Sequence, residues 1–353
     1  MSVYTNAKEF WAHFLEMENS LKECLKTKNY EVLNPLVEEL DDMALAYTGC
    51  HFFVENLYDD FECTFDTGPN KTSQYLAQYF VDMAPSIIKN TWILNASLPP
   101  LSSKAVMAGI QIKDTTYYLS DFYVFYEVAK NQPLLDCKVY CPGYSLIENP
   151  EHKKEMSMYL LELAIGECAY EAYLASVDFI DQPDENKKFC NLTDFYETIL
   201  NLVDEHHWKE YNSALDIYSV YQPIQDFAHD SLRKDMKFIF TTHPNLIEET
   251  IENKTDVLSD LKVKDGAFGY VYYSNPFGTQ EDAKFRQELS KKIDSIFVKE
   301  KCAKVIGGAI GKSYSYIDVI VFDTKRFDTV FASVSKQLKN TIELHYQSFL
   351  SNK

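Results

Sequence analysis

Phe61-Glu62-Cys63-Thr64-Phe65-Asp66-Thr67-Gly68-Pro69-Asn70 is the stretch that decides the fold. Residues 61–65 have the character of a strand, and residues 66–70 supply a turn whose polar side chains can cap a helix. Apolar residues then recur at helical spacing up to Met83, and Thr91-Trp92-Ile93-Leu94 is typical of a second strand. The sequence therefore predicts a strand, an amphipathic helix and a returning strand, a unit that needs further elements to cover both of its faces.

The length of the chain, 353 residues, exceeds what one ordinary core holds, so two domains are expected. The polar, proline-containing stretch Asp181–Lys188 interrupts the hydrophobic periodicity and predicts the boundary. The N-terminal domain would cover residues 1–182 and begin with a helical hairpin at residues 6–46, because two apolar stripes at helical spacing flank a polar break. The C-terminal domain would cover residues 189–353.

A similar order of strands and helices is predicted in both halves. In the first half, a long helix from Glu151 to about Ala175 follows the strand candidates Val106–Lys113, Thr116–Val128 and Asp136–Tyr140. In the second half, the predicted elements are strand Phe268–Tyr273, helix Thr279–Glu300, strands Ala303–Ile310 and Tyr314–Phe322, and a final helix from about Phe327 to Phe349. The predicted fold class is α+β, with two β-α-β-β-α sandwich units of mostly antiparallel sheets, similar to ferredoxin-like folds, and the N-terminal helical hairpin.

The charge of the chain restricts its partners. A formal net charge of −19 makes nucleic acid a poor partner, because binding a polyanion relies on clustered lysine and arginine, and it favours a basic protein partner instead. No stretch reaches the roughly eighteen apolar residues of a membrane span, and residues 1–14 lack a signal-peptide core. The eight cysteines are scattered and are expected to be reduced thiols, so the predicted location is the cytoplasm.

Several motifs that suggest catalysis lack the context that the chemistry needs. Gly307–Ser313 resembles a phosphate-binding loop, but the spacing between its glycines is one residue too short. The segment that follows it is predicted to be a strand, whereas a phosphate-binding loop leads into a helix, so a hairpin turn is predicted. Asp66-Thr67-Gly68 resembles half of an aspartic protease site without a second half. His206 and Glu210 would share a helical face but have no third ligand. We therefore predict no catalytic, cofactor-binding or metal-binding residues.

Two groups of acidic residues are candidates for an interaction site. Glu38, Glu39, Asp41 and Asp42 are predicted to close the second helix, where the helix dipole disfavours negative charge. They form either a solvated face or a contact surface for a basic partner. Glu167 lies on a mostly apolar helix, where a carboxylate needs a partner. Structural pairing, exposure at the helix edge and a binding role are all open to it.

Short motifs in the two halves resemble known families. Phe10-Trp11-x-x-Phe14, Ala84-Pro85 before Trp92, and Ile165-Gly166-Glu167 together resemble an uncharacterised bacterial family of unknown function whose members share FWxxF, AP…W and GE-helix motifs. In the C-terminal half, Phe285–Ile296 followed by Ser315-Tyr316-Ile317-Asp318-Val319 is similar to the superfamily of the type B regulator of ribonuclease E, a small acidic inhibitor. Neither resemblance implies catalytic residues.

Three classes of function follow from these observations. The first is a non-catalytic acidic module that binds a protein, such as an immunity protein or an inhibitor of a basic enzyme. The second is an enzyme whose site is assembled from residues dispersed along the chain. The third is a structural homo-oligomer joined through a sheet face. Of the clustered tyrosines at 117–126 and 270–316, those that point inward are expected to pack in the core, and those that point outward form a candidate interface that would anchor a partner of the first class.

Overall fold

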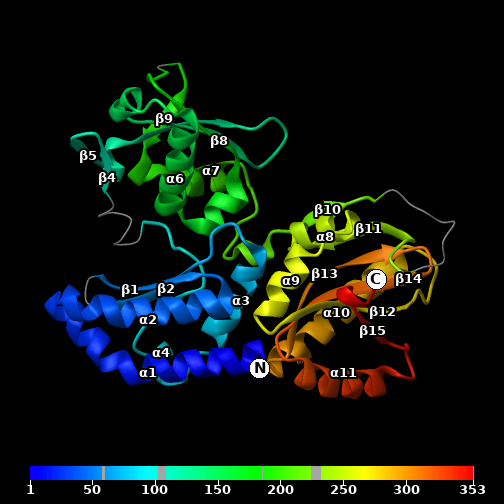
Figure 1. Cartoon of the computed structure of the whole chain (residues 1–353). Coiled ribbons are helices and arrows are strands. Elements are labelled where there is room, and N and C mark those ends of the chain that lie inside the picture. Colours follow the sequence, from blue (N-terminus) through cyan, green and yellow to red (C-terminus); the bar gives the residue numbers. More distant parts are fainter. Residues whose placement is uncertain (58–59, 102–108, 185, 224–231, 353) are drawn as a thin grey trace. The chain divides into compact units, whose positions relative to one another are not determined.

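The computed structural model describes residues 1–57, 60–101, 109–184, 186–223 and 232–352 (Figure 1). Two compact units are present: unit 1 comprises residues 1–12, 46–48 and 218–353, and unit 2 comprises residues 13–45 and 49–217. The predicted α+β class, the N-terminal helical hairpin and the predominance of antiparallel pairing are confirmed. The hairpin consists of α1 (Val3–Thr27) and α2 (Tyr30–Thr48), and both helices contribute residues to both units.

The strand-helix-strand unit around residue 61 is present in unit 2. Its sheet has the order β1 (His51–Leu57), β2 (Asp60–Asp66) and β3 (Ile93–Asn95), with β1 antiparallel and β3 parallel to β2. Helix α3 (Lys71–Met83) and the short α4 (Ser86–Lys89) connect β2 to β3. The Asn70 side chain caps α3 by accepting a hydrogen bond from the Ser73 amide at 3.2 Å, as the turn chemistry predicts.

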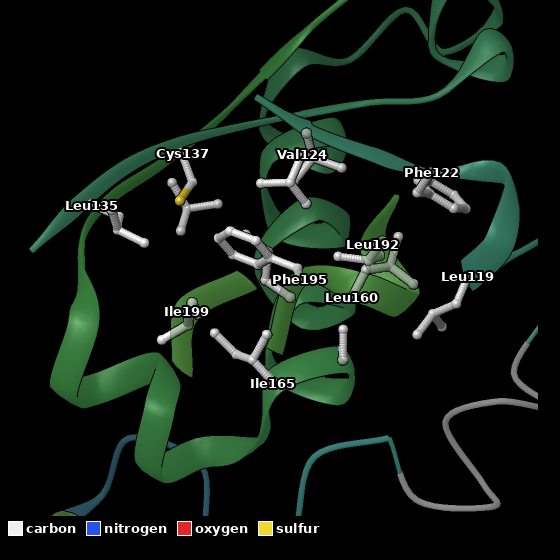
Figure 2. Packing of buried hydrophobic residues seen from close by; sticks show 14 of the residues in the cluster. Leu119, Phe122, Val124, Leu135, Cys137, Leu160, Ile165, Leu192, Phe195 and Ile199 are labelled. Atoms are coloured by element: carbon white, nitrogen blue, oxygen red, sulfur yellow. The ribbon is translucent and has the colours of Figure 1, made fainter. Parts of the chain in front are cut away.

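A second part of unit 2 is built on a four-stranded sheet with the order β8-β7-β6-β9. The strands are β6 (Tyr123–Val128), β7 (Leu135–Tyr140), β8 (Leu174–Ile180) and β9 (Lys188–Asn191), and the separate pair β4 (Gly109–Ile112) and β5 (Thr115–Tyr118) precedes them. Helices α6 (Pro150–Tyr173) and α7 (Phe195–Glu205) pack against this sheet. Figure 2 shows Ile165 of α6 and Phe195 of α7 in the same apolar core as Val124 and Cys137.

The boundary expected at Asp181–Lys188 does not coincide with the division between the compact units. This segment lies between β8 and β9, which are strands of one sheet, and β9 pairs with β6. The chain passes from unit 2 to unit 1 later, between Ile217 and Tyr218. Polarity and proline mark a surface loop, but they do not reveal which strands pair across it.

Unit 1 contains a six-stranded, fully antiparallel sheet with the order β10-β11-β13-β14-β12-β15. Its strands are β10 (Ser219–Tyr221), β11 (Met236–Thr241), β12 (Ala267–Ser274), β13 (Ala303–Gly311), β14 (Tyr314–Val321) and β15 (His345–Ser348). Its helices are α8 (Pro244–Ile251), α9 (Asp256–Val263), α10 (Glu281–Lys299) and α11 (Thr324–Leu338). The order β12-α10-β13-β14-α11 is the predicted β-α-β-β-α order, whereas the strands of the first half are distributed over three sheets.

The final helix is shorter than predicted. Helix α11 ends at Leu338, and the residues that follow form β15, which pairs with β12 at the edge of the sheet. Tyr346 of β15 lies against Phe327 of α11, with the ring centroids 4.6 Å apart. The prediction of a helix as far as Phe349 was therefore wrong, because pairing with a distant strand outweighs local helical spacing.

Candidate functional site

The four acidic residues of α2 lie within the helix, not at its end. Helix α2 continues to Thr48 and is closed by Gly49, which adopts a left-handed conformation with φ 77°. Asp42 is thus followed by six further helical residues, and the prediction that the acids close the helix was wrong. The overlooked signal was Gly49, since a glycine directly after an apolar stripe commonly terminates a helix.

The environments of these acids differ. Glu38, Glu39 and Asp42 are exposed, whereas Asp41 is half-buried. The Asp41 carboxylate accepts a hydrogen bond of 2.5 Å from the Phe52 amide, which ties α2 to β1. Glu39 lies 2.8 Å from His13 Nε2, across the helical hairpin. Asp41 therefore has a structural contact, while Glu38 and Asp42 present their charges to solvent.

Glu167 is buried, with 2% of its surface exposed, and its carboxyl group joins three segments of unit 2. It accepts hydrogen bonds from the amides of Thr67, at 2.9 Å, and Leu98, at 3.1 Å, and the Thr67 hydroxyl contacts its second oxygen. The preceding residue, Gly166, interrupts the helical backbone of α6 with φ 76° and ψ 157°. The expectation that this carboxylate requires a partner agrees with these contacts.

The loop after β3 fills the break in α6. The Leu101 amide donates to the Leu163 carbonyl at 3.2 Å, and the Glu167 amide donates to the Leu98 carbonyl at 3.1 Å. A side chain at Gly166 would place a Cβ atom 2.8 Å from the Leu98 carbonyl oxygen. Glycine is therefore required both by the backbone angle and by the close approach of the loop.

Burial controls the protonation of this region. Burial raises the pKa of Glu167 to about 8, and the negative charge of Asp66 adds to the increase, while the hydrogen bonds from Thr67 and Leu98 oppose it. Burial and Asp66 also raise the pKa of Glu162 to about 7. Glu167 is therefore mainly neutral at pH 7, although it accepts two backbone hydrogen bonds.

A buried lysine near Glu167 was not anticipated from the sequence. Lys71, at the start of α3, forms an ion pair with Glu171 and donates a hydrogen bond of 2.7 Å to the Ala214 carbonyl. Burial lowers the pKa of Lys71, and the neighbouring carboxylate of Glu171 opposes this shift. The partner residues are about a hundred or more positions away in the sequence, so no local pattern indicates this pairing.

A cavity of about 380 Å³ lies in unit 2 beside the break in α6. Its wall combines residues of the loop after β3, residues of α6 around Gly166, Tyr196 of α7 and the segment 210–213. Among the described residues that line this cavity, Glu210 alone carries a charged side chain. The sequence predicted a strand as far as Leu94, a loop from Ala96 and a helix as far as about Tyr211. None of these local predictions brings the segments 94–100 and 210–213 together, so the cavity could not be foreseen.

The predicted hairpin connection is present but shorter than Gly307–Ser313, since Gly307–Gly311 belong to β13 and only Lys312 and Ser313 lie between the strands. Strands β13 and β14 pair on either side of Lys312 and Ser313. The Asp235 carboxylate accepts hydrogen bonds from the amides of Ser313, at 2.7 Å, and Tyr314, at 3.2 Å. Because a carboxylate of the protein already occupies these amides, the turn has no free N–H groups here to bind a phosphate.

The remaining motifs also have structural explanations. Thr67 lies in the turn before α3 and contacts Glu167, as described above. Helix α7 ends at Glu205, so His206 and Glu210 do not share a helical face, contrary to the prediction. Within the described residues, no group of three or more His, Cys, Asp or Glu side chains is suited to hold a metal ion.

A buried ion pair in unit 1 was also missed. Arg233 binds Asp318 through two contacts, of 2.6 Å and 3.3 Å, and its guanidinium lies over the rings of Tyr270, Tyr316 and Phe349. Tyr270 and Tyr316 are consequently buried and supply no contact surface. Of the tyrosines expected to form an outer sheet face, Tyr118 and Tyr123 are the exposed ones in the described chain.

In comparisons with known proteins, no family model, curated protein or solved structure matches the chain. The resemblances stated from the short motifs therefore stay predictions. In the part of the chain that the structure describes, none of the helices combines the length and apolar character needed to cross a lipid bilayer.

Proposed function

We propose that the protein acts by binding a basic protein through the exposed face of α2 and catalyses no reaction itself, in the manner of an immunity protein or an inhibitor of a basic enzyme. The observation that carries this proposal is the composition of α2. Its 19 residues include five acids and no lysine or arginine. The chain as a whole is also acidic, with a formal net charge of −19.

Repulsion within α2 supports a role for these charges. Glu38 and Asp42 are four residues apart and therefore neighbours on one side of the helix, and like charges at this spacing cost roughly 0.2–0.5 kcal/mol per pair. Both side chains are exposed, so the fold does not require their charge. A basic partner would relieve this repulsion and would be attracted over a distance set by salt screening, about 8 Å at physiological ionic strength.

The proposed compartment is the cytoplasm. All eight cysteines are free thiols, and six of them are buried. Reduced, buried thiols are what a reducing compartment maintains.

Affinity capture from a lysate of the native host, followed by association kinetics with the captured protein, tests the proposal. The variant Glu38→Lys/Asp42→Lys reverses two exposed charges and leaves Asp41 in place, because Asp41 holds the Phe52 amide. Its association rate constant at low salt is expected to fall by about tenfold or more, since steering charges act mainly on association.

The matched control is Glu151→Lys/Glu155→Lys, which changes the net charge equally at two exposed positions of α6 that have the same spacing. This control is expected to slow association much less. Equal slowing by both variants would assign the attraction to net charge and contradict the role of α2. Failure to capture any basic protein at low salt would contradict the proposal as a whole.

A further inference from the structure

The cavity of unit 2 has the chemistry of a small-ligand site. Its volume of about 380 Å³ lies within the range of about 300–1,000 Å³ that is typical of small-molecule pockets. The wall is drawn from segments that are distant in sequence: the loop at 94–100, α6 around Gly166, α7 at Tyr196, and residues 210–213. All of these residues belong to unit 2.

The wall of this cavity is held in place by buried and partly buried hydrogen bonds. The loop at 94–100 is fastened to the break in α6 through the paired backbone bonds at Leu98 and Leu101, and Glu167 holds the Leu98 amide. The segment that carries Lys209 and Tyr211 is likewise fastened to α6: the Cys168 thiol donates to the Tyr211 carbonyl at 3.5 Å, and the Tyr173 hydroxyl donates to the Lys209 carbonyl at 3.0 Å. A ligand would therefore meet a preformed wall, which lowers the entropic cost of binding.

The side chains of the wall favour a cation over an anion. Three tyrosines line the cavity, Tyr173, Tyr196 and Tyr211, and aromatic faces attract ammonium groups. Glu210 supplies a carboxylate and forms no ion pair within the described chain, whereas no lysine or arginine is among the described lining residues. An anionic ligand would have no counter-charge in this wall.

A lysine of the protein itself, Lys209, already lies over the ring of Tyr211. The Lys209 ammonium lies 4.2 Å from the ring centroid of Tyr211 and donates a hydrogen bond of 3.2 Å to the Asp216 carbonyl. The other nearby cation, Lys71, is paired with Glu171. The Cys168 thiol is no competing nucleophile or ligand at neutral pH, because burial raises its pKa to about 11.

We propose that this cavity binds an alkylammonium group, with Glu210 as its counter-ion and the face of Tyr196 as a contact for the charged end. The group could be carried by a free amine or by a lysine side chain of a protein, since both present the same cation on an alkyl chain. The inference is independent of the role proposed for α2, because none of the described lining residues comes from that helix.

Isothermal titration calorimetry of the full chain tests this inference. The probes are hexylamine, the neutral hexanol and the anionic hexanoate, which share their length and differ in charge. Hexylamine is expected to bind more tightly than both others, and its binding is expected to weaken with added salt. Equal or tighter binding of hexanol or hexanoate would overturn the assignment of a cation site.

Variants locate the site. Glu210→Gln is expected to weaken hexylamine binding about fivefold, the size expected for loss of one exposed ion pair, while Glu205→Gln, which removes an exposed carboxylate outside the cavity, leaves binding unchanged. Tyr196→Leu is expected to weaken binding severalfold, and Tyr196→Phe to restore it, because phenylalanine keeps the aromatic face. Unchanged binding in both Glu210→Gln and Tyr196→Leu would place the amine elsewhere and refute the inference.

A lysine-containing peptide distinguishes the two sources of the cation. A short capped peptide with one central lysine and free 1,5-diaminopentane are titrated in parallel. Tighter binding of the peptide would identify the lysine of a protein as the natural group, and tighter binding of the diamine would identify a free amine. Absence of binding by both at millimolar concentration would refute the inference.

Discussion

Replacement of Glu167 by glutamine is expected to remove the decrease in folding stability that the ionisation of Glu167 causes as the pH rises. The carboxyl group is 2% exposed, and its pKa in the folded protein is about 8, compared with an ordinary value of 4.5. Between these two pH values the unfolded chain releases a proton that the folded chain retains. Stability that is fully present below pH 4.5 is therefore lost as the pH rises towards 8.

The magnitude follows from the difference between the two pKa values. One pKa unit corresponds to about 1.4 kcal/mol, so the contribution of Glu167 falls by about 3 kcal/mol between pH 5 and pH 7.5. This is a large part of the roughly 5–15 kcal/mol that stabilises an ordinary domain. Glu162, whose pKa is raised to about 7, lowers stability in the same direction as the pH rises. The Glu167→Gln variant therefore keeps the part of the pH dependence that comes from Glu162.

Glutamine can replace the neutral carboxyl group at position 167. Its carbonyl oxygen accepts the hydrogen bonds that the Thr67 and Leu98 amides now donate. The Thr67 hydroxyl donates to the second carboxyl oxygen of Glu167. When its single hydrogen turns instead to the Gly68 carbonyl, at 3.2 Å, the hydroxyl oxygen is able to accept from the glutamine amide. We therefore expect the stability of Glu167→Gln to be closest to that of the wild type at pH 5 and its advantage to grow by about 3 kcal/mol between pH 5 and pH 7.5.

Urea unfolding at pH 5, 6, 7 and 7.5 measures this effect, with tryptophan fluorescence as the signal. The control is Glu155→Gln on the same helix, where the side chain is exposed and the pH dependence of the wild type should be retained. A wild-type stability that stays constant or increases between pH 5 and pH 7.5 would refute the reasoning. So would a slope for Glu167→Gln equal to that of the control.

Three further predictions concern the glycine at the helix break and the charges of unit 1. Gly166→Ala is expected to lower the free energy of unfolding by about 2 kcal/mol or more, because the new Cβ meets backbone atoms at 2.8 Å and the backbone angle is strained for alanine. A decrease below about 0.5 kcal/mol, measured by urea unfolding, would contradict this. ATP with magnesium is expected not to bind at the hairpin, because Asp235 occupies its amides, and micromolar affinity lost in Lys312→Ala would contradict this. Asp318→Ala is expected to cost about 3–5 kcal/mol in thermal or urea unfolding by leaving Arg233 buried without its partner, and a cost below about 1 kcal/mol would contradict this.

The parts of the fold that were predicted correctly depend on local chemistry. The turn at residues 66–70 contains its own helix cap, Asn70, and the strands on either side of α3 are close in sequence. The hairpin at Lys312 and Ser313 likewise connects neighbouring strands. Periodicity and turn residues are sufficient where the interacting segments are adjacent along the chain.

The parts that were missed depend on pairing between distant segments. β15 forms an edge of the sheet by pairing with β12, more than seventy residues earlier, and its four residues have no alternation long enough to identify a strand. β9 belongs with β6 for the same reason, so the polar stretch before it was taken for a domain boundary. Long-range pairing of this kind is not recorded in the local sequence.

The end of α2 shows how one residue changes an argument about function. The helix dipole acts within the last turn, and the position of Gly49 places all four acids, from Glu38 to Asp42, outside its range. The case for a functional role of these acids then rests on their mutual repulsion and on the absence of lysine and arginine from α2, both of which can be tested without reference to the helix end.

The pair Gly166-Glu167 has a physical explanation that involves no catalysis. Gly166 allows α6 to leave helical geometry, which releases the Leu163 carbonyl and the Glu167 amide to bond with the loop after β3. Glu167 then fixes the same loop through the Leu98 amide. Together they shape one wall of the cavity, so the carboxyl group positions the loop and does not itself line the space a ligand would enter. A ligand-dependent role for this region is therefore expected to depend on Glu210 and Tyr196, while substitutions at Glu167 are expected to act through stability.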